Sequence, residues 1–567
     1  MFTSLPKNPQ VFIHWNWAQI KPYADHLAKR QLSQDTLESW IKDWSDLNRL
    51  ISEMDSRLYV ATTVNTGDKE ARNRFNTFMD EIYTSSQAVD QVLKQKLLAS
   101  GLQPKGFEIP LRNMRVEAEI FREENLPLLA EETKQSLEYD EIIGAQTVLW
   151  EGKEMTITQL QPVYLNQDRL LREKAWRLSM ERKQVDRQKL NELWGRLLAL
   201  RERIAHNAGF GDYRTYRWKQ LLRFDYTPEN CRQFHQAIEQ VVIPAARRIY
   251  AKRQKRLGLD TLRPWDLNVD PLGRDALKPY QTITEMESKV SAIFHRVDPE
   301  LGEYFETMRS NGLLDLDNRK DKAPGAYCNS YETVRLPFIF ANAVGLHDDV
   351  STLLHEGGHA FHVFETVRLP YYHQLSVGME FAEVASMAME LLSSPYLAES
   401  EGGFYSERDA ARASIEHLEE AVFFWPYMAV VDGFQHWVYT EEGAAANPEN
   451  CDHKWAELWQ RYMGGVDWSG LDDLMVTGWQ RKLHIFQVPF YYVEYGLASL
   501  GAFQVWRNAL KDQGGAVAAY RRALALGGTV TLPKLYETAG AKFAFDKETM
   551  QMAVDLAEEQ IEKLEKV

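Results

Sequence analysis

At 567 residues the chain is far longer than a domain built on one core, so we expect two or more lobes. Hydrophobic residues make up 44% of the sequence and aromatic residues 12%, which is enough for large cores and excludes extensive disorder. The formal net charge of −15 would repel phosphates, which argues against a nucleic-acid partner.

The cysteines and the N-terminus predict a cellular location. Cys231, Cys328 and Cys451 are scattered and lack CxxC spacing, which is typical of a reducing compartment; they could hold a metal only if the fold brought them together. The first seven residues lack the basic and apolar regions of a signal peptide, and no stretch approaches about 18 uninterrupted apolar residues. We therefore predict a soluble cytoplasmic protein without a membrane partner. No sequence feature favours a monomer over a homodimer.

The first part of the chain is predicted to be a helical lobe over residues 1–208. Apolar residues recur at helical spacing over residues 35–100, and helical patterning returns over residues 112–137 and 168–208. Residues 147–157 differ, because β-branched residues flank a Gly-containing turn and predict a β-hairpin. This lobe has no cluster of residues that suggests chemistry.

A boundary is expected at residues 209–228, where two glycines and a proline interrupt the helical pattern, and residues 209–567 would form the second, catalytic domain. Helices are predicted over residues 228–257 and up to residue 308. Residues 311–337 are rich in turn formers, with short strands expected at 325–328 and 336–340. An exposed strand edge can hold an extended peptide by main-chain hydrogen bonds.

Residues 354–360 read LHEGGHA and predict a metal-binding helix. On a helix His355 and His359 lie one turn apart, so both imidazoles can reach one tetrahedral Zn²⁺. Glu356 projects beside them, where it could take a proton from water. The helix is expected to begin at Asp348 or Asp349, either of which can cap it. The pair Gly357 and Gly358 suggests a close approach by a neighbouring element or by substrate.

A catalytic zinc site has three protein ligands and keeps its fourth position for water. The two histidines therefore need a third protein ligand from elsewhere in the chain. Glu380 and Glu383 lie on the next predicted helix, 21 and 24 residues after His359, and their spacing does not choose between them. His362 and His373 remain alternatives, although three ligands from one straight helix give poor tetrahedral geometry.

The motif HExGHxxH at residues 355–362, followed by FAEVAS at residues 381–386, resembles the thimet-oligopeptidase family of zinc metallopeptidases, with the oligoendopeptidase F branch as the nearest match. The resemblance implies His355, His359 and Glu383 as ligands of one Zn²⁺ per chain, and Glu356 as the general base. It also implies that Glu390 orients a ligand imidazole, and it leaves Glu380 as an ordinary polar residue.

A third segment, residues 484–496, is similar to the family's His- and Tyr-rich block. The resemblance implies that His484, Tyr495 and either Tyr491 or Tyr492 contact the substrate and the developing oxyanion. Phenol hydroxyl groups are neutral donors suited to this task. The family further implies a mostly α fold, with two helical lobes around a deep substrate channel, a zincin-type HExxH helix and a small β element near the site.

These observations predict a zinc-dependent endopeptidase that hydrolyses short, unstructured oligopeptides. The alternatives are a metallocarboxypeptidase with the same HExxH core and, from another class, a catalytically inactive peptide-binding protein. A purely structural zinc site is disfavoured, because such sites usually fill all four positions with protein ligands.

Overall fold

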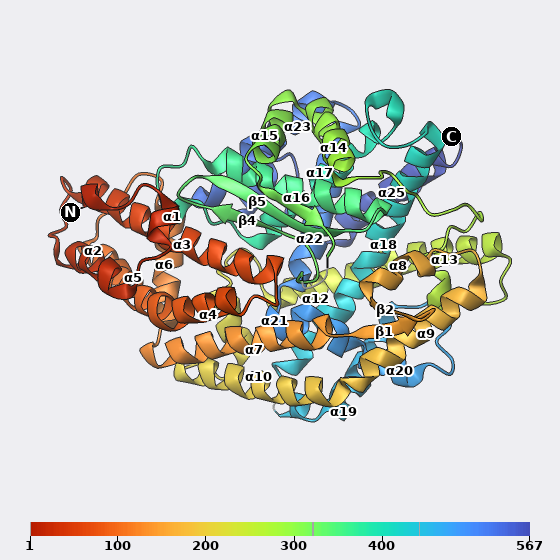
Figure 1. Cartoon of the computed structure of the whole chain (residues 1–567), viewed down its shortest axis with the longest axis horizontal. Helices are drawn as coiled ribbons and strands as arrows, with labels where there is room; N and C mark the ends of the chain where they lie inside the picture. Colours follow the sequence, from red (N-terminus) through yellow and green to blue (C-terminus); the bar gives the residue numbers. More distant parts are fainter. Residues whose placement is uncertain (1, 320–321, 442) are drawn as a thin grey trace.

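The protein is mostly helical, as the sequence predicts: 70% of residues are helical and 5% lie in strands. The computed structural model describes residues 2–319, 322–441 and 443–567 (Figure 1). The described residues contain two large hydrophobic cores, one built from residues 12–114 and one that draws mainly on residues 190–561 and also includes Val60, Ile120 and Tyr139. No helix among them combines the length and the apolar character needed to cross a membrane.

The N-terminal helices form one end of the molecule (Figure 1). They are α1 (Pro9–Phe12), α2 (Trp17–Lys29), α3 (Leu37–Val64), α4 (Lys69–Thr77), α5 (Thr84–Ser100) and α6 (Glu108–Ile120). Their apolar faces enclose the smaller core, in which Trp40 and Trp44 of α3 are fully buried. Amphipathic helices of this kind are stabilised chiefly by the burial of one face.

The predicted hairpin is present, because β1 (Thr147–Trp150) pairs antiparallel with β2 (Lys153–Thr156). It follows α7 (Leu126–Gly144) and precedes α8 (Gln161–Tyr164), α9 (Arg169–Val185) and α10 (Arg187–Asn207). The α10 side chains pack into the larger core, and Nε1 of Trp194 donates to the carbonyl of Ala445 at 3.0 Å. The division of the chain at residue 208 stays a prediction.

The rest of the described chain contains the remaining α-helices and a three-stranded sheet. The helices are α11 (Tyr213–Gln220), α12 (Pro228–Ala237), α13 (Ile243–Leu257), α14 (Ile283–Val297), α15 (Pro299–Ser310), α16 (His347–Thr366), α17 (Met379–Ser393), α18 (Glu407–Val438), α19 (Pro448–Tyr462), α20 (Asp472–Val476), α21 (Leu483–Gln487), α22 (Tyr492–Ala509), α23 (Gln513–Leu524), α24 (Leu532–Thr538) and α25 (Lys547–Leu564). Helix α16 packs between the sheet and α17, and α17 packs in turn on α22.

The sheet has the order β3-β5-β4, with β3 (Leu314–Asp317) parallel and β4 (Tyr327–Tyr331) antiparallel to the central β5 (Leu336–Ala343). Strands β4 and β5 confirm the two predicted strands. Strand β3 was missed, because its four residues lie in a segment rich in turn formers. Its alternation of leucine and aspartate is the period-two pattern of a half-buried strand.

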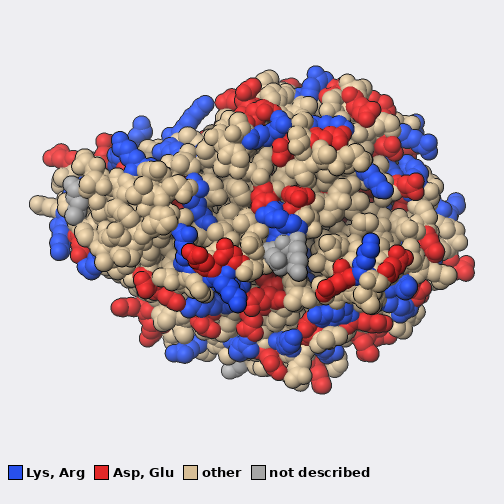
Figure 2. Space-filling model, viewed as in Figure 1, with Lys and Arg blue, Asp and Glu red and all other residues tan. Residues whose placement is uncertain are grey.

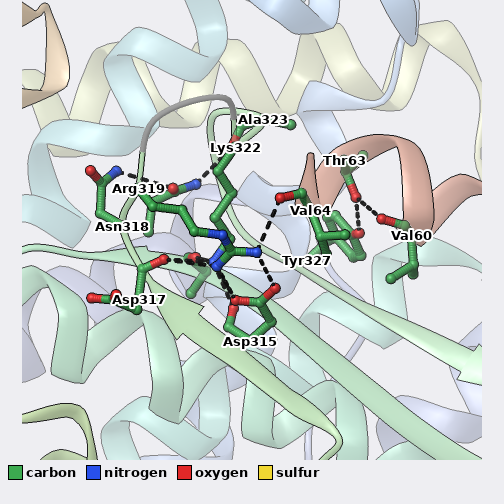
Figure 3. Close-up of polar contacts among 12 residues, drawn as sticks. Val60, Thr63, Val64, Asp315, Asp317, Asn318, Arg319, Lys322, Ala323 and Tyr327 are labelled. Atoms are coloured by element: carbon green, nitrogen blue, oxygen red, sulfur yellow. Dashed lines mark hydrogen bonds and ion pairs between the residues drawn. The ribbon is translucent and has the colours of Figure 1, made fainter. Parts of the chain in front are cut away.

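The N-terminal helices are tied to the sheet by polar contacts (Figure 3). The amide of Ala323 donates to the carbonyl of Thr63 at 2.8 Å, and Oγ1 of Thr63 lies 2.5 Å from the Tyr327 hydroxyl. Arg319 donates to the carbonyl of Val64 at 3.0 Å and pairs with Asp315 at 2.6 Å. The end of α3 is therefore fixed against β4, the edge strand nearest to it.

Charges of both signs are mixed over the visible face of the molecule (Figure 2). The face carries no continuous basic surface of the kind that binds phosphate backbones.

Candidate active site

The two histidines of the HExxH motif and Glu383 meet at one point. His355 and His359 come from α16 and Glu383 from α17, and their ligand atoms all lie within 4.8 Å of one another. Oε2 of Glu383 is 3.3 Å from Nε2 of His355 and 3.5 Å from Nε2 of His359. Bonds of about 2.0–2.2 Å to one tetrahedral zinc ion would separate the donor atoms by about 3.3–3.5 Å. The three residues therefore fit a zinc ion.

The helix that carries the histidines begins slightly earlier than expected. Helix α16 starts at His347, and Asp349 lies inside its first turn. Its Oδ2 accepts hydrogen bonds from the amides of Val344, Gly345 and Leu346 at 3.0, 2.7 and 2.8 Å. The prediction that Asp348 or Asp349 is the N-cap is therefore wrong: Leu346 holds that position, and Asp349 reaches back from the first turn to fix the segment before the helix.

The glycine pair is explained by neighbouring elements. A Cβ on Gly358 would stand 2.4 Å from the Ala385 carbonyl oxygen and 2.5 Å from the Ser386 Cα, both in the α17 backbone. A Cβ on Gly357 would stand 2.5 Å from the ring of Phe294. The absence of a side chain at Gly358 lets α17 approach closely enough for Glu383 to reach the histidines.

Two side chains of the cluster, His355 and Glu383, are each held by a further polar group. Nδ1 of His355 is 2.7 Å from Oε1 of Glu390, which places the proton on Nδ1 and leaves Nε2 free to bind a metal. The Tyr491 hydroxyl donates to Oε1 of Glu383 at 2.7 Å, and Oγ of Ser386 donates to Oε2 at 3.0 Å. Ser386 was not predicted as a site residue, although it belongs to the FAEVAS segment. Its contact with Glu383 forms only because the two residues lie one turn apart on α17.

Glu356 lies beside the cluster in a buried position with 6% of its surface exposed. Burial raises the pKa of its carboxyl group, while the adjacent His359 and His355 act in the opposite direction. Its Oε2 has no hydrogen-bond partner in the described part of the chain. A carboxylate with a raised pKa and an unused oxygen is suited to accept a proton.

The His- and Tyr-rich segment divides into two groups. Tyr491 and Tyr495 line the cavity, and the Tyr495 hydroxyl is 3.5 Å from Nε2 of His484. Burial, followed by the charge of Lys482, lowers the pKa of His484 to about 3, so the imidazole is neutral. Tyr492 is buried instead, and its ring packs against Phe424 and Tyr427. The structure therefore brings Tyr491 rather than Tyr492 to the cluster.

Glu380 is not an ordinary polar residue, contrary to the sequence-based expectation. It is 4% exposed, and its Oε1 accepts a hydrogen bond from the Tyr226 hydroxyl at 2.7 Å. Nε of Arg223 lies 3.6 Å from the same oxygen, and Nη2 of Arg223 donates to Oε1 of Glu494 at 2.6 Å. These residues come from three separate segments, so their buried network was not visible in the spacing of the sequence.

The two histidines considered as alternative third ligands lie apart from the three-residue cluster. His362 lines the cavity, and burial lowers its pKa to about 4. The ring of His373 packs on Trp44 with ring centroids 4.1 Å apart. Its Nε2 lies 3.4 Å from Nδ2 of Asn48 in α3.

The cluster forms one wall of a cavity of about 410 Å³. Strand β4 supplies the facing wall through Tyr327, Cys328 and Ser330, and Glu332 and Arg335 add charges of opposite sign. Burial and the nearby Glu356 raise the pKa of the Cys328 thiol well above its usual value. These lining residues were not predicted individually, because their approach to the site depends on the pairing of β4 with β5.

Two family models match the chain. Peptidase family M3 matches residues 163–555, and the peptidase M3 N-terminal domain matches residues 12–108. The first match covers more than half of the sequence, so the chain belongs to peptidase family M3. This confirms the family predicted from residues 355–362 and 381–386, and its members are metallopeptidases.

Individual relatives agree with this family. Oligopeptidase PepF of Bacillus subtilis is 27% identical over 332 residues, which are 57% of this chain and 47% of PepF. An oligoendopeptidase F homolog of Borreliella burgdorferi is 22% identical over 57% of this chain and 54% of its own length. The chain thus spans about half the length of these curated relatives. The structure of PZ peptidase A with an inhibitor superposes with a TM-score of 0.91, at 26% identity, over 99% of both chains.

Proposed function

We propose that the protein is a zinc-dependent endopeptidase that hydrolyses internal bonds of short oligopeptides. The observation that carries this proposal is the convergence of His355, His359 and Glu383 beside the buried Glu356 at a cavity wall. We assign the first three residues to hold one Zn²⁺ per chain and Glu390 to orient His355. When bound, the ion supplies a Lewis acid that lowers the pKa of a water molecule towards about 7.

Glu356 is the proposed general base. Its carboxylate accepts the proton of the attacking water and then delivers that proton to the amine of the departing peptide. Tyr495 lines the cavity, and we assign its hydroxyl group, with the neutral His484 beside it, to donate to the developing oxyanion. Tyr491 fixes the Glu383 carboxylate through its hydrogen bond. Tyr492 supports these residues by packing and does not take part in the reaction.

The shape of the cavity supports peptide substrates. Strand β4 is an edge strand and lines the cavity, so its backbone can pair with an extended peptide. A cavity of about 410 Å³ accommodates a few residues of extended chain and excludes folded proteins. We therefore propose short, unstructured peptides as substrates, and a cytoplasmic location that rests on the sequence features.

A digest of a peptide with both ends blocked tests this function. The wild-type protein should cleave internal bonds, and a chelator should stop cleavage. The Glu356→Gln variant should retain its metal and lose turnover by at least about 100-fold, as expected for loss of a general base. Cleavage that requires a free C-terminal carboxylate would favour the metallocarboxypeptidase. Binding without any cleavage would favour an inactive peptide-binding protein, and near-native turnover of Glu356→Gln would show that another residue is the base.

A further inference from the structure

A second group of metal-ligating side chains lies outside the active site. Cys231 and His235 are one turn apart on α12, and Asp432 and His436 are one turn apart on α18. All four side chains are buried, with at most 9% of each residue exposed. The ligand atoms of Cys231, Asp432 and His436 all lie within 4.8 Å of one another. Two facing helices that each contribute a pair at this spacing can surround one ion.

The polar atoms of this group are incompletely satisfied by the protein. Among the described residues, neither ring nitrogen of His436 and neither carboxylate oxygen of Asp432 makes a hydrogen bond, and the two side chains meet only as an ion pair. Leaving buried polar groups without hydrogen bonds costs roughly 1–3 kcal/mol each. Nε2 of His436 lies 3.3 Å from Oδ2 of Asp432, the same separation found between His355 and Glu383 in the active site. This is the separation expected for two donors on one tetrahedral ion, about 3.3 Å.

We propose that Cys231, Asp432 and His436 bind a second divalent metal ion of the zinc class. Thiolate and imidazole donors favour zinc over magnesium or calcium, which prefer oxygen ligands. Binding forms the sulfur–metal bond and releases the thiol proton of Cys231 to solvent. The two negative ligands then balance the charge of a divalent ion, so the buried site is neutral. Oδ1 of Asp432 is available as a further donor.

His235 is a positioning residue in this site. Its Nε2 makes an ion-pair contact of 2.9 Å with Oδ2 of Asp432, which is shorter than a ligand-to-ligand edge. It lies outside the group of three mutually close ligand atoms. His235 therefore orients the carboxylate, as groups that contact metal ligands generally do.

The ion would join two distant parts of the chain. Helix α12 and helix α18 are separated by about 200 residues in sequence, and α18 packs on α22, which carries Tyr495. A metal bound between α12 and α18 stabilises the folded state and not the unfolded chain. This role is structural, and it is independent of catalysis in the cavity.

Cobalt substitution distinguishes the two sites. Co²⁺ bound to a thiolate gives a sulfur-to-metal charge-transfer band in the near ultraviolet, and the ligands proposed for the active site include no thiolate. The wild-type protein, stripped of metal and titrated with Co²⁺, should bind two ions per chain and show this band. His359→Ala should lose one ion and keep the band, whereas Cys231→Ser should lose the band and keep the other ion. These outcomes do not depend on peptidase activity.

Matched variants make the test specific. Cys451→Ser removes a buried thiol that donates to the Ala445 carbonyl, and Cys328→Ser removes the thiol near Glu356; both variants should keep the band. His235→Gln should keep the band but weaken Co²⁺ binding by about 10-fold or more. A wild-type protein that binds one Co²⁺ without the band would overturn the proposal, even if Cys231→Ser fails to fold. A band that survives in Cys231→Ser, or that disappears in Cys328→Ser, would overturn it equally.

Discussion

Gly358→Ala tests whether the close approach of α16 and α17 assembles the metal site. The added Cβ would stand 2.4 Å from the Ala385 carbonyl oxygen, whereas ordinary contact begins at 3.4 Å. The α17 backbone must therefore move by about 1 Å, and Glu383 moves with it. Overpacking of this kind costs about 1–3 kcal/mol, and the gain in helix propensity returns about 1 kcal/mol at most. A displacement of about 1 Å in a catalytic group lowers turnover by about 100-fold.

The assay combines zinc affinity, hydrolysis of a blocked peptide and denaturant unfolding. We expect Gly358→Ala to bind zinc more weakly, to lose about 100-fold in turnover and to unfold at lower denaturant concentration. The matched control is Gly195→Ala in α10, where a Cβ meets nothing within 4 Å. That variant should be more stable by about 0.8–1.0 kcal/mol and fully active. Wild-type zinc affinity and turnover in Gly358→Ala would refute the claim that this contact positions Glu383.

Three further changes test the groups around the site. Glu390→Gln removes the charge that faces Nδ1 of His355, so zinc affinity should fall by about 10-fold in a chelator competition; unchanged affinity would contradict its role. His484→Gln should lower kcat without moving the acid limb of the rate profile, because the lowered pKa of about 3 keeps this imidazole neutral above that pH. Arg223→Met leaves Glu380 and Glu494 buried without their cation and should destabilise the protein by about 3–5 kcal/mol in urea unfolding. Burial and then Glu380 raise the pKa of Glu494 above its usual value, so the native state holds this proton more tightly and stability falls as pH rises through the folded-state pKa. Wild-type stability of Arg223→Met near pH 9 would contradict the argument.

The chemistry of the candidate site was visible in the sequence because it depends on local spacing. A helix places His355, Glu356 and His359 by its own geometry, and the resemblance to a family added Glu383 and Glu390 on the next helix. Composition and periodicity were also sufficient for the mostly helical fold. Strand β3 was missed because four residues carry too little pattern to stand out among turn formers.

Contacts between distant segments could not be predicted from the sequence. Arg223 reaches Glu380 and Glu494 only after α17 and α22 have packed together, so one sequence gives no sign that Glu380 is paired. The same limit applies to Cys231 and His436, which no spacing rule connects. The choice of Tyr491 over Tyr492 also needed the structure. The two tyrosines are sequence neighbours, and only the fold shows that the Tyr491 side chain points toward Glu383.

Helix α17 connects the buried Arg223 network to the candidate metal site. It carries Glu380, Glu383 and Glu390 along its length, so the paired buried carboxylate, the proposed metal ligand and the group proposed to orient His355 move together as one rigid element. Arg223 holds this helix near its beginning, and the contact at Gly358 holds it near its middle. A rigid helix fixed at two points keeps a ligand within the few tenths of an ångström that zinc geometry tolerates. The position of Glu383 is therefore set by packing remote from the metal as much as by the ligands themselves.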